Sequence, residues 1–442
     1  MQPQKANFKL VTLNSKLYPL NSLSHARHLD LTDPLKHFRD RFHIPKHNNQ
    51  DVVYLSGNSL GLQPKTAKQY FEQELKDWAT LGVEAHFQGK NPWFNYHEWF
   101  SKPLANIVGA KPGEVVVMNN LTVNLHLLLV SFYRPEGKRR KIIFEETAFP
   151  SDRYALESQV RFHGLDPAEC LIELKPSENA AHIETAHVLD VIEKAGDELA
   201  LVMLGGVNYF SGQLFDLKKI THATHNVGAI AGYDLAHAAG NVPLSLHDWN
   251  VDFACWCSYK YLNSGPGGVA GIFVNEKYGD GSALPRFHGW WGNDAKTRFQ
   301  MAKEFNPAQG AEGWQLSNAP IFNMIGLRAS LEIFEEAGFA NLRAKSEKLT
   351  AYLESLLNNI NQTTGKGQIH ILTPANPAER GCQLSVRIID NGLKLFDEMT
   401  SNGFLPDWRQ PDVIRFSPVP LYNTFEDVWK TANFIEKYFE EA

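Results

Sequence analysis

The chain has 442 residues, of which 43% are hydrophobic and 21% are charged, and its formal net charge is −6. These values are ordinary for a globular protein of about two domains, and they give no electrostatic case for a nucleic-acid partner. No apolar run is long enough to span a membrane and the N-terminus lacks the apolar core of a signal peptide, so we expect a cytoplasmic protein without membrane contact.

The cysteines and histidines indicate neither a disulfide framework nor a metal site. Cys255 and Cys257 lie two residues apart in an apolar run and should face the same side of a strand. This placement favours buried thiols in a reducing compartment, and Cys382 is also expected to be buried. His222 and His225 lie in a polar helical stretch without cysteine or carboxylate companions, so no metal is predicted.

The first 50 residues are polar and irregular, apart from a helix expected at residues 34–42. A short strand follows at 52–55, then a loop at 56–61 and a helix that runs from Pro64 to residue 78.

From there strands alternate with helices. Strands are expected at residues 114–118, 141–144, 170–174, 199–204, 229–233 and 251–257, and helices at residues 123–132, 151–163, 186–195 and 217–226. This alternation predicts an α/β fold with a mostly parallel central sheet and helices on both faces.

After about residue 315 the pattern changes to that of a smaller α+β domain. A helical run at 321–336 continues beyond Gly338 to residue 358, and short strands at 369–372, 382–389 and 413–416 precede a last helix from residue 424. We therefore expect three parts. They are an N-terminal segment that packs with the small domain (1–50), a large domain (51–315) and a small α+β domain (316–442).

One lysine and one aspartate indicate a reaction class. Lys260 lies between Tyr259 and Tyr261 and precedes a glycine-rich stretch at 265–271, while Asp234 ends an expected strand. A lysine amine on a rigid element and a carboxylate against a pyridinium nitrogen are what pyridoxal phosphate (PLP) requires, so the pair predicts a PLP site. Taken alone, Asp234 is equally well a helix cap. The glycines follow the lysine instead of opening a long helix, which favours close backbone approach over a dinucleotide site.

Other candidate residues have structural alternatives. Thr122 begins a helix after a strand. Its hydroxyl can bind a phosphate together with the free N–H groups there, or it can simply cap the helix. Phe149 and Asp152 can cover and bond an aromatic ring, but a hydrophobic residue before a serine cap gives the same pattern. Arg415, in an apolar strand, can clamp a carboxylate or pair with a local aspartate. Trp290, in a glycine-bounded loop, can contact a ligand or another subunit, or pack in the core.

In combination, these residues and their surroundings resemble the kynureninases, which are PLP enzymes of the aspartate-aminotransferase type. The resemblance runs in order from about residue 50 to the C-terminus. It rests on residues 55–64, 120–126, 148–152, 233–238, 247–249, 251–263, 289–292, 316–320 and 418–423.

The resemblance implies a PLP-dependent transferase fold and a role for each matching position. Lys260 would be the Schiff-base lysine and the base for the Cα proton, Asp234 the partner of the ring nitrogen, and Tyr259 a proton relay. The cofactor would also contact Leu121, Thr122, Phe149, Pro150, Ser151, Asp152 and His237, and, across a homodimer with shared active sites, Trp290 and Asn318. The substrate would contact Ser59, His86, Asn318 and Arg415.

The activity implied is hydrolytic Cβ–Cγ cleavage of L-kynurenine or 3-hydroxykynurenine to anthranilate or 3-hydroxyanthranilate and L-alanine, in tryptophan breakdown or NAD synthesis. One departure is visible, because family members can carry a serine where this chain has Gly205. A rival is another PLP enzyme of this fold, such as a cysteine desulfurase, which needs an exposed nucleophilic cysteine; Cys382 is the only candidate. A non-catalytic PLP-binding protein has the least support, because Lys260 is intact.

Overall fold

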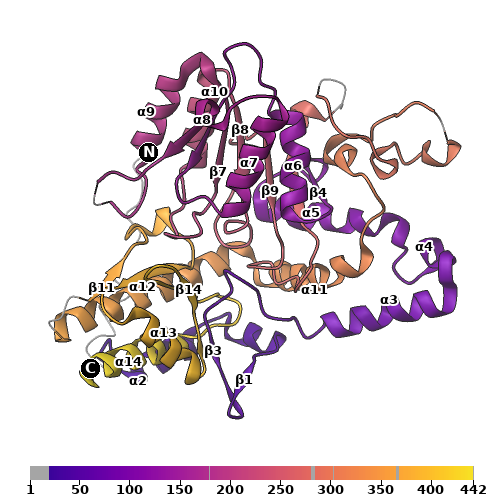
Figure 1. Ribbon diagram of the computed structural model, residues 1–442. Coiled ribbons are helices and arrows are strands. Elements are labelled where there is room, and N and C mark those ends of the chain that lie inside the picture. The colour runs from indigo at the N-terminus through magenta and orange to yellow at the C-terminus, as the bar shows by residue number, and fades with distance from the viewer. Residues whose placement is uncertain (1–18, 179, 280–283, 302, 365–367, 442) are drawn as a thin grey trace, which may run out of the picture.

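The computed structural model describes residues 19–178, 180–279, 284–301, 303–364 and 368–441. A larger body holds the main sheet, and a smaller body made mostly of C-terminal segments lies beside it (Figure 1). Within the described part of the chain, no helix combines the length and the apolar character needed to cross a membrane.

The main sheet has seven strands in the order β4-β10-β9-β8-β7-β5-β6. Its strands are β4 (Val115–Val117), β5 (Lys141–Glu145), β6 (Leu171–Leu174), β7 (Leu199–Gly205), β8 (Ile230–Asp234), β9 (Phe253–Trp256) and β10 (Gly271–Val274). Five neighbouring strands, from β9 to β6, are parallel, and β10 is antiparallel to both of its partners. The mostly parallel sheet is therefore confirmed, although β10 was not expected from the sequence.

Both faces of this sheet are buried because alternate side chains of each strand enter different hydrophobic cores. On β7, Leu201 and Met203 pack with α6 (Leu121–Phe132) and α7 (Pro150–Phe162). Val202 and Leu204 pack on the opposite face. That face is covered by α5 (Ser101–Val108), α9 (Thr185–Ala195) and α10 (Leu217–Asn226), while the short α8 (Pro167–Cys170) precedes β6.

The smaller body is built on a four-stranded antiparallel sheet in the order β11-β12-β15-β14. Its strands are β11 (Ile369–Ile371), β12 (Leu384–Ile388), β14 (Asp407–Arg409) and β15 (Val413–Phe416), and its helices are α12 (Phe339–Thr364), α13 (Gly392–Ser401) and α14 (Phe425–Glu441). Helix α11 (Ile321–Ala337) precedes α12 and packs against α5 of the larger body and against α3 (Ala67–Leu81). Helices α11, α12 and α14 and strands β11, β12 and β15 were expected from the sequence, but α13 and β14 were not.

The N-terminal segment contacts the smaller body through a helix that was not expected, α2 (Leu23–Thr32). The Asp30 carboxylate accepts hydrogen bonds from the first N–H groups of α14, at 2.7 Å from Phe425 and 2.9 Å from Glu426. The Asp30 carboxylate thus accepts hydrogen bonds from backbone N–H groups that have no partner within their own helix. The helix expected at 34–42 is only a 3₁₀ segment, Lys36–Arg41.

The strand expected at 52–55 is β3 (Val53–Tyr54), and it pairs with β13 (Phe404–Leu405). Val53 and Leu55 lie in the core of the smaller body. The domain limits at residues 50 and 315 remain a prediction. These contacts lead us to propose that the smaller body also includes β3. A separate hairpin, β1 (Lys46–His47) with β2 (Gln50–Asp51), precedes it.

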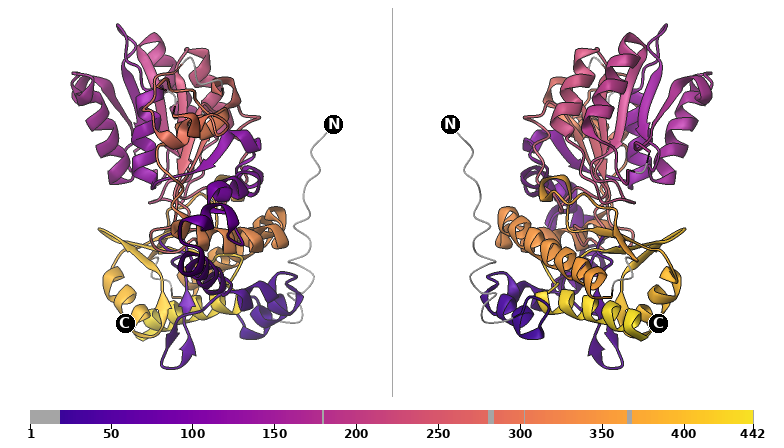
Figure 2. Two further views of the ribbon diagram at one scale, coloured as in Figure 1. Left: turned by 90° about the vertical axis from the view of Figure 1, so that its right-hand side faces the viewer. Right: turned by 90° about the vertical axis from the view of Figure 1, so that its left-hand side faces the viewer.

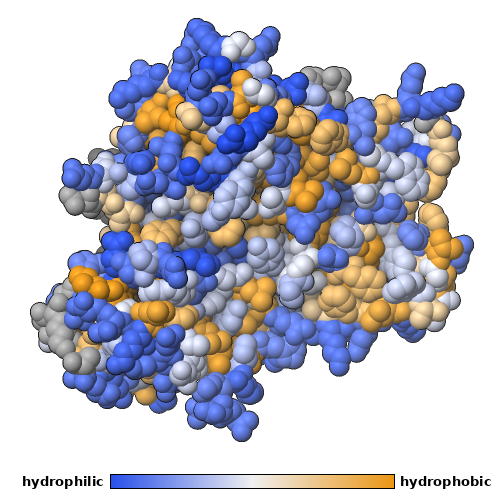
Figure 3. Space-filling view, in the orientation of Figure 1, coloured by the Kyte–Doolittle hydropathy of each residue, from blue (hydrophilic) through white to orange (hydrophobic). Residues whose placement is uncertain are grey.

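Two helices, α3 (Ala67–Leu81) and α4 (Ala85–Gln88), extend away from the larger body (Figures 1 and 2). Apolar side chains are exposed along them, with 58% of Trp78, 72% of Val83 and 58% of Phe87 accessible. In the space-filling view, hydrophobic residues gather at the right-hand edge, over these helices (Figure 3). A surface of this kind is typical of a protein–protein contact.

Candidate active site

A cavity of about 440 Å³ lies where β5, β7 and β8 end at their carboxyl edges. Ligands of open α/β sheets bind at this edge, because loops and helix N-termini converge there. The cavity is lined by Asn120, Leu121, Thr122, Val123, Glu145, Phe149, Ser151, Asp152, Gly205, Val207, Tyr209, Asp234, Ala236, His237, Tyr259 and Lys260. It therefore brings together most of the residues expected to hold the cofactor.

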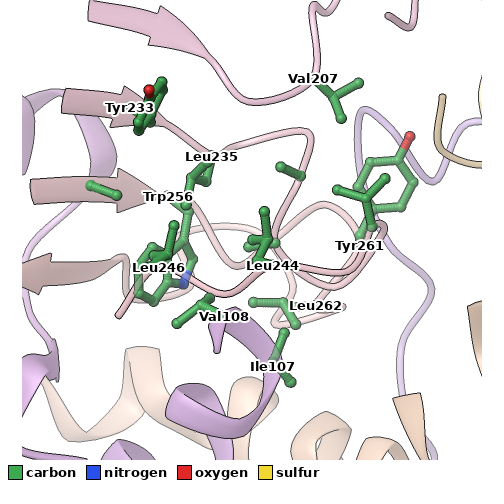
Figure 4. Packing of buried hydrophobic residues seen from close by; sticks show 14 of the residues in the cluster. Ile107, Val108, Val207, Tyr233, Leu235, Leu244, Leu246, Trp256, Tyr261 and Leu262 are labelled. Atoms are coloured by element: carbon green, nitrogen blue, oxygen red, sulfur yellow. The ribbon is translucent and has the colours of Figure 1, made fainter. Parts of the chain in front are cut away.

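Lys260 and Asp234 are held in place by buried neighbours on either side in the sequence. Tyr233 and Leu235 flank the aspartate, and Tyr261 and Leu262 follow the lysine; all four are at most 2% exposed. Figure 4 shows these side chains and Trp256 of β9 among the buried hydrophobic residues around the strand ends. Because Lys260 and Asp234 are flanked by residues of this core, their backbone positions are fixed.

The Lys260 ammonium is buried and donates a hydrogen bond to His237 Nε2 at 2.8 Å. Burial, with Lys260 and Arg415 nearby, holds the pKa of His237 well below its usual range, so the imidazole is neutral. Its other nitrogen, Nδ1, is buried and has no partner among the described residues. Lys260 Nζ also lies 5.7 Å from the centre of the Phe149 ring.

Asp234 ends β8, and its Oδ1 accepts a hydrogen bond from the Ala236 N–H at 2.7 Å. A second carboxyl group, that of Asp152 on α7, is hydrogen-bonded to it. Burial and the Asp234 charge raise the pKa of Asp152 well above its usual range, and burial also raises the pKa of Asp234. Asp234 thus does more than cap the turn that follows it, because its carboxyl group also lines the cavity.

Tyr259 forms part of the cavity wall next to the lysine. Burial, together with a hydrogen bond to the Cys257 thiol, raises the pKa of Tyr259, so the phenol keeps its proton at neutral pH. Burial also raises the pKa of Cys257. All four cysteines are buried and free, and burial was expected for Cys255, Cys257 and Cys382.

Two helix N-termini open into the cavity. Asn120, Leu121 and Thr122 begin α6, and Phe149 and Ser151 begin α7. Neither helix has a side-chain hydrogen bond at its N-cap, so its first N–H groups can receive an anion. Pro150 occupies the first position of α7 but does not line the cavity.

The close backbone approach that was expected of the glycines at 265–271 is found instead at Gly61, since a Cβ at Gly265 or Gly267 would meet no backbone atom within 4 Å. Gly61 N–H donates to the Tyr259 carbonyl at 2.8 Å, and a Cβ at Gly61 would lie 2.3 Å from the Lys260 carbonyl oxygen. Gly265 and Gly267 have φ values of 83° and 74°, a conformation that other residues rarely adopt.

Arg415 lies outside this cavity, on the interior strand β15, and is fully buried. Its guanidinium donates to Asp407 Oδ1, with Nη2 at 2.7 Å and Nε at 3.1 Å, and to the Tyr209 carbonyl at 2.7 Å. Ser59 bonds to both Asp407 and Arg415. The structure thus shows the alternative interpretation, an arginine paired with a local aspartate, and a carboxylate-binding role for Arg415 and Ser59 remains a prediction.

Three further expected residues are not brought to the cavity within one chain. His86 lies on the projecting helix α4, with its ring 5.3 Å from that of Trp93. Trp290 is 43% exposed, and its indole N–H donates to the Arg298 carbonyl. Asn318 is exposed.

Three residues that sequence analysis missed take part in the site. Glu145 and Tyr209 line the cavity, and Asp407 holds Arg415. The position of Glu145 was a usable signal, because it follows an expected strand just as Asp234 does. Tyr209 and Asp407 lie in loops or short strands, and nothing in their local sequence distinguishes them.

The residues present fit PLP. The helix N-termini can receive its phosphate, Asp234 its ring nitrogen and Phe149 the face of its ring. His237 Nδ1 and Asp152 Oδ1 are buried polar atoms still lacking partners, which a polar ligand in the cavity would satisfy. Among the residues that the structure describes, no group of three or more His, Cys, Asp or Glu side chains is arranged to hold a metal ion.

Comparison with known proteins agrees with this geometry. Residues 53–378 match the aminotransferase class-V family, and residues 342–435 match the kynureninase C-terminal domain. The chain is 54% identical to the kynureninase of Flavobacterium psychrophilum over 417 residues, which cover 94% of this chain and 98% of that protein. It is also 54% identical to the kynureninase of Myxococcus xanthus over 422 residues, covering 95% and 98%.

Solved structures show the same fold at low sequence identity. A C-DES mutant with glycine covalently linked to its PLP cofactor has a TM-score of 0.73 at 17% identity, covering 91% of this chain and 98% of that one. The cysteine desulfurase CsdA from Escherichia coli has a TM-score of 0.73 at 16% identity, covering 92% and 98%. The fold is thus that of PLP-dependent class-V aminotransferases, the cofactor is PLP, and the chain belongs to the kynureninase family.

Proposed function

We propose that this chain hydrolyses the Cβ–Cγ bond of L-kynurenine, or of its 3-hydroxy form, to anthranilate or 3-hydroxyanthranilate and L-alanine. One observation carries the proposal. Lys260 and Asp234 lie in one cavity of a chain that is 54% identical to a curated kynureninase over nearly its full length. The cleavage consumes one water molecule, which supplies the hydroxyl of the aromatic acid and the hydrogen gained at Cβ.

Bound PLP supplies the electron sink that allows bonds at the substrate's Cα and Cβ to break. Lys260 Nζ is the only lysine amine among the described residues lining the cavity, and it is the base that takes and returns the Cα proton. Tyr259 keeps its phenolic proton and can donate it beside the lysine. The Asp234 carboxylate stabilises positive charge on the cofactor's ring nitrogen.

The α-carboxylate of the substrate would bind Arg415 by taking over hydrogen bonds that Asp407 now accepts. Tyr209 connects the two regions. Its carbonyl holds Arg415, and its ring lies edge-on to that of Phe149 with 5.3 Å between ring centres. A substrate reaching from Lys260 to Arg415 would therefore pass Tyr209.

A cysteine desulfurase activity is disfavoured. That chemistry needs an accessible thiolate, whereas Cys382 is fully buried and burial raises its pKa to about 12. The likeness to CsdA, at 16% identity, shows the fold alone.

The deciding assay is anthranilate fluorescence with L-kynurenine, run beside 3-hydroxykynurenine. Lys260→Ala should form no aromatic product and no borohydride-reducible link to PLP. Lys219→Ala, at a lysine whose side chain is 66% exposed, is the matched control and should retain both. Absence of product from either substrate in the unmodified enzyme would reject the proposal.

We further propose that the active sites are shared in a homodimer. The exposed apolar side chains of α3 and α4 support a subunit contact, and exposed Trp290 and Asn318 are then free to reach a neighbouring cavity. If Asn318 acts across the interface, Lys260→Ala and Asn318→Ala subunits that have each lost activity should complement one another. Random re-pairing of equal amounts would restore about a quarter of the sites. No recovery after confirmed subunit exchange would contradict the shared site.

A further inference from the structure

A third buried acid faces the cofactor cavity, in addition to Asp234 and Asp152. Glu145 ends β5, as Asp234 ends β8, and is only 3% exposed. The three carboxyl groups come from β5, α7 and β8 and line one cavity. Glu145 is not among the residues expected to contact the cofactor.

The bonding of Glu145 is incomplete. Its Oε1 accepts a hydrogen bond from the Gly205 N–H at 3.0 Å. Its Oε2 is buried and has no hydrogen-bond partner in the described part of the chain. A buried carboxyl oxygen without a partner is costly, and more so when the group is ionised. This arrangement favours a protonated acid or a positively charged ligand beside it.

Gly205 makes room for this carboxyl group. A Cβ at position 205 would lie 2.9 Å from Glu145 Oε1, closer than real Cβ contacts allow. The glycine is also where the chain departs from the serine that family members can carry. A larger residue at 205 would require the Glu145 carboxyl group to shift.

The charges around Glu145 are mostly negative. It faces Asp234 and, across the cavity, Asp152, which is bonded to Asp234. Lys260, whose ammonium is bonded to His237, is the one cationic side chain among the described residues that line the cavity, and the amide of Asn208 also faces Glu145. Burial, with the Asp234 charge beside it, raises the pKa of Glu145 to about 7. Three neighbouring buried carboxyl groups cannot all be ionised, because like charges disfavour one another.

We propose that Glu145 is the charge-compensating acid of the cofactor site: it carries a proton before PLP binds and releases it when the cofactor's positively charged ring nitrogen is placed beside Asp234. The inference rests on the proposed contact between Asp234 and that nitrogen. A new positive charge favours the ionised form of each neighbouring carboxyl group. Binding of PLP and deprotonation of Glu145 are therefore linked, and each promotes the other.

The size of the linkage can be calculated. If the ring charge lowers the pKa of Glu145 by about one unit, about half a proton is released per site near pH 6.5. The affinity of the wild-type protein for PLP, relative to a variant that cannot titrate at 145, should rise about sevenfold between pH 5.5 and pH 8.

The test uses the full chain stripped of cofactor. Calorimetric titration with PLP in two buffers of different ionisation enthalpy gives the number of protons released. Glu145→Gln keeps the shape of the side chain but cannot titrate, so it should release about half a proton fewer per site than the wild type near pH 6.5. The matched control is Glu146→Gln, at the neighbouring exposed glutamate, which pairs with Lys175; it should behave as the wild type.

Infrared difference spectra of the wild-type protein keep the inference testable if Glu145→Gln does not fold. Addition of PLP should remove the C=O band of a protonated carboxyl group. Equal proton counts for wild type and Glu145→Gln, or an unchanged carboxyl band, would overturn the role of Glu145. Failure of the wild-type protein to bind PLP at all would instead refute the proposed function.

Discussion

The ion pair between Asp407 and Arg415 offers the sharpest test of how the site is assembled. Arg415 is fully buried, and Asp407 is the only carboxylate bonded to it in the described chain. Asp407→Asn removes that charge and keeps the size of the side chain. Loss of one partner of a buried pair costs about 3–5 kcal/mol. Because the Tyr209 carbonyl and the Ser59 hydroxyl remain, we expect about 3 kcal/mol.

That loss can be measured by thermal and urea unfolding. The unfolding entropy of a chain of this length is about 0.9 kcal/mol per kelvin, so the Tm should fall by about 3 °C. Asp412→Asn is the matched control, because Asp412 pairs with Arg387 on the same small sheet while their side chains are 36% and 43% exposed. It should cost less than about 1 kcal/mol.

A carboxylate ligand separates the two roles of Arg415. L-alanine, the proposed product, should stabilise Asp407→Asn more than the wild type, because its carboxylate no longer competes with Asp407 for the guanidinium. Equal stability of Asp407→Asn and the Asp412→Asn control would refute the importance of the pair. Equal stabilisation of wild type and Asp407→Asn by L-alanine would refute the exchange of carboxylates at Arg415.

Three further outcomes are expected. Gly61→Ala should destabilise the fold by about 1–3 kcal/mol and slow turnover, because its Cβ would press on the Lys260 backbone; Gly113→Ala, with open space around the Cβ, should not. His237 is neutral in the folded protein and gains a proton on unfolding below the ordinary histidine pKa of 6.5, so the free energy of unfolding should decrease as the pH is lowered below 6.5. Between about pH 6.5 and 5.5, His237→Asn should therefore lose about 1 kcal/mol less of this free energy than the wild type, as measured by urea titrations. A thiol reagent should label no cysteine until the protein unfolds, and rapid labelling of one thiol in the native protein would revive the desulfurase alternative.

Part of the site was predictable because the residues that carry the chemistry are marked by their immediate neighbours in the sequence. Lys260 between two tyrosines, and Asp234 at the end of an apolar strand, are recognisable from short stretches. The strands of the main sheet were equally visible, since apolar residues buried on both faces form continuous runs. Strand β10 was missed because its glycine-rich approach gave the pattern of a loop.

The rest was decided by contacts between distant segments. The bond from Asp30 to the start of α14 joins residues nearly 400 positions apart, and no local pattern predicts it. The same holds for Asp407, which is an ordinary strand aspartate until β15 places the buried Arg415 against it.

By itself, the sequence indicated the reaction class, because a lysine between two tyrosines and an aspartate that ends an apolar strand are the groups that PLP chemistry requires. Only the tertiary structure decided the electrostatics. Glu145 is one ordinary glutamate among many in the sequence, and its pKa is raised because β5, α7 and β8 bury it beside Asp152 and Asp234. The physical reason is that the pKa of a buried group depends on desolvation and on nearby charges, and both are fixed by chain segments far away in the sequence.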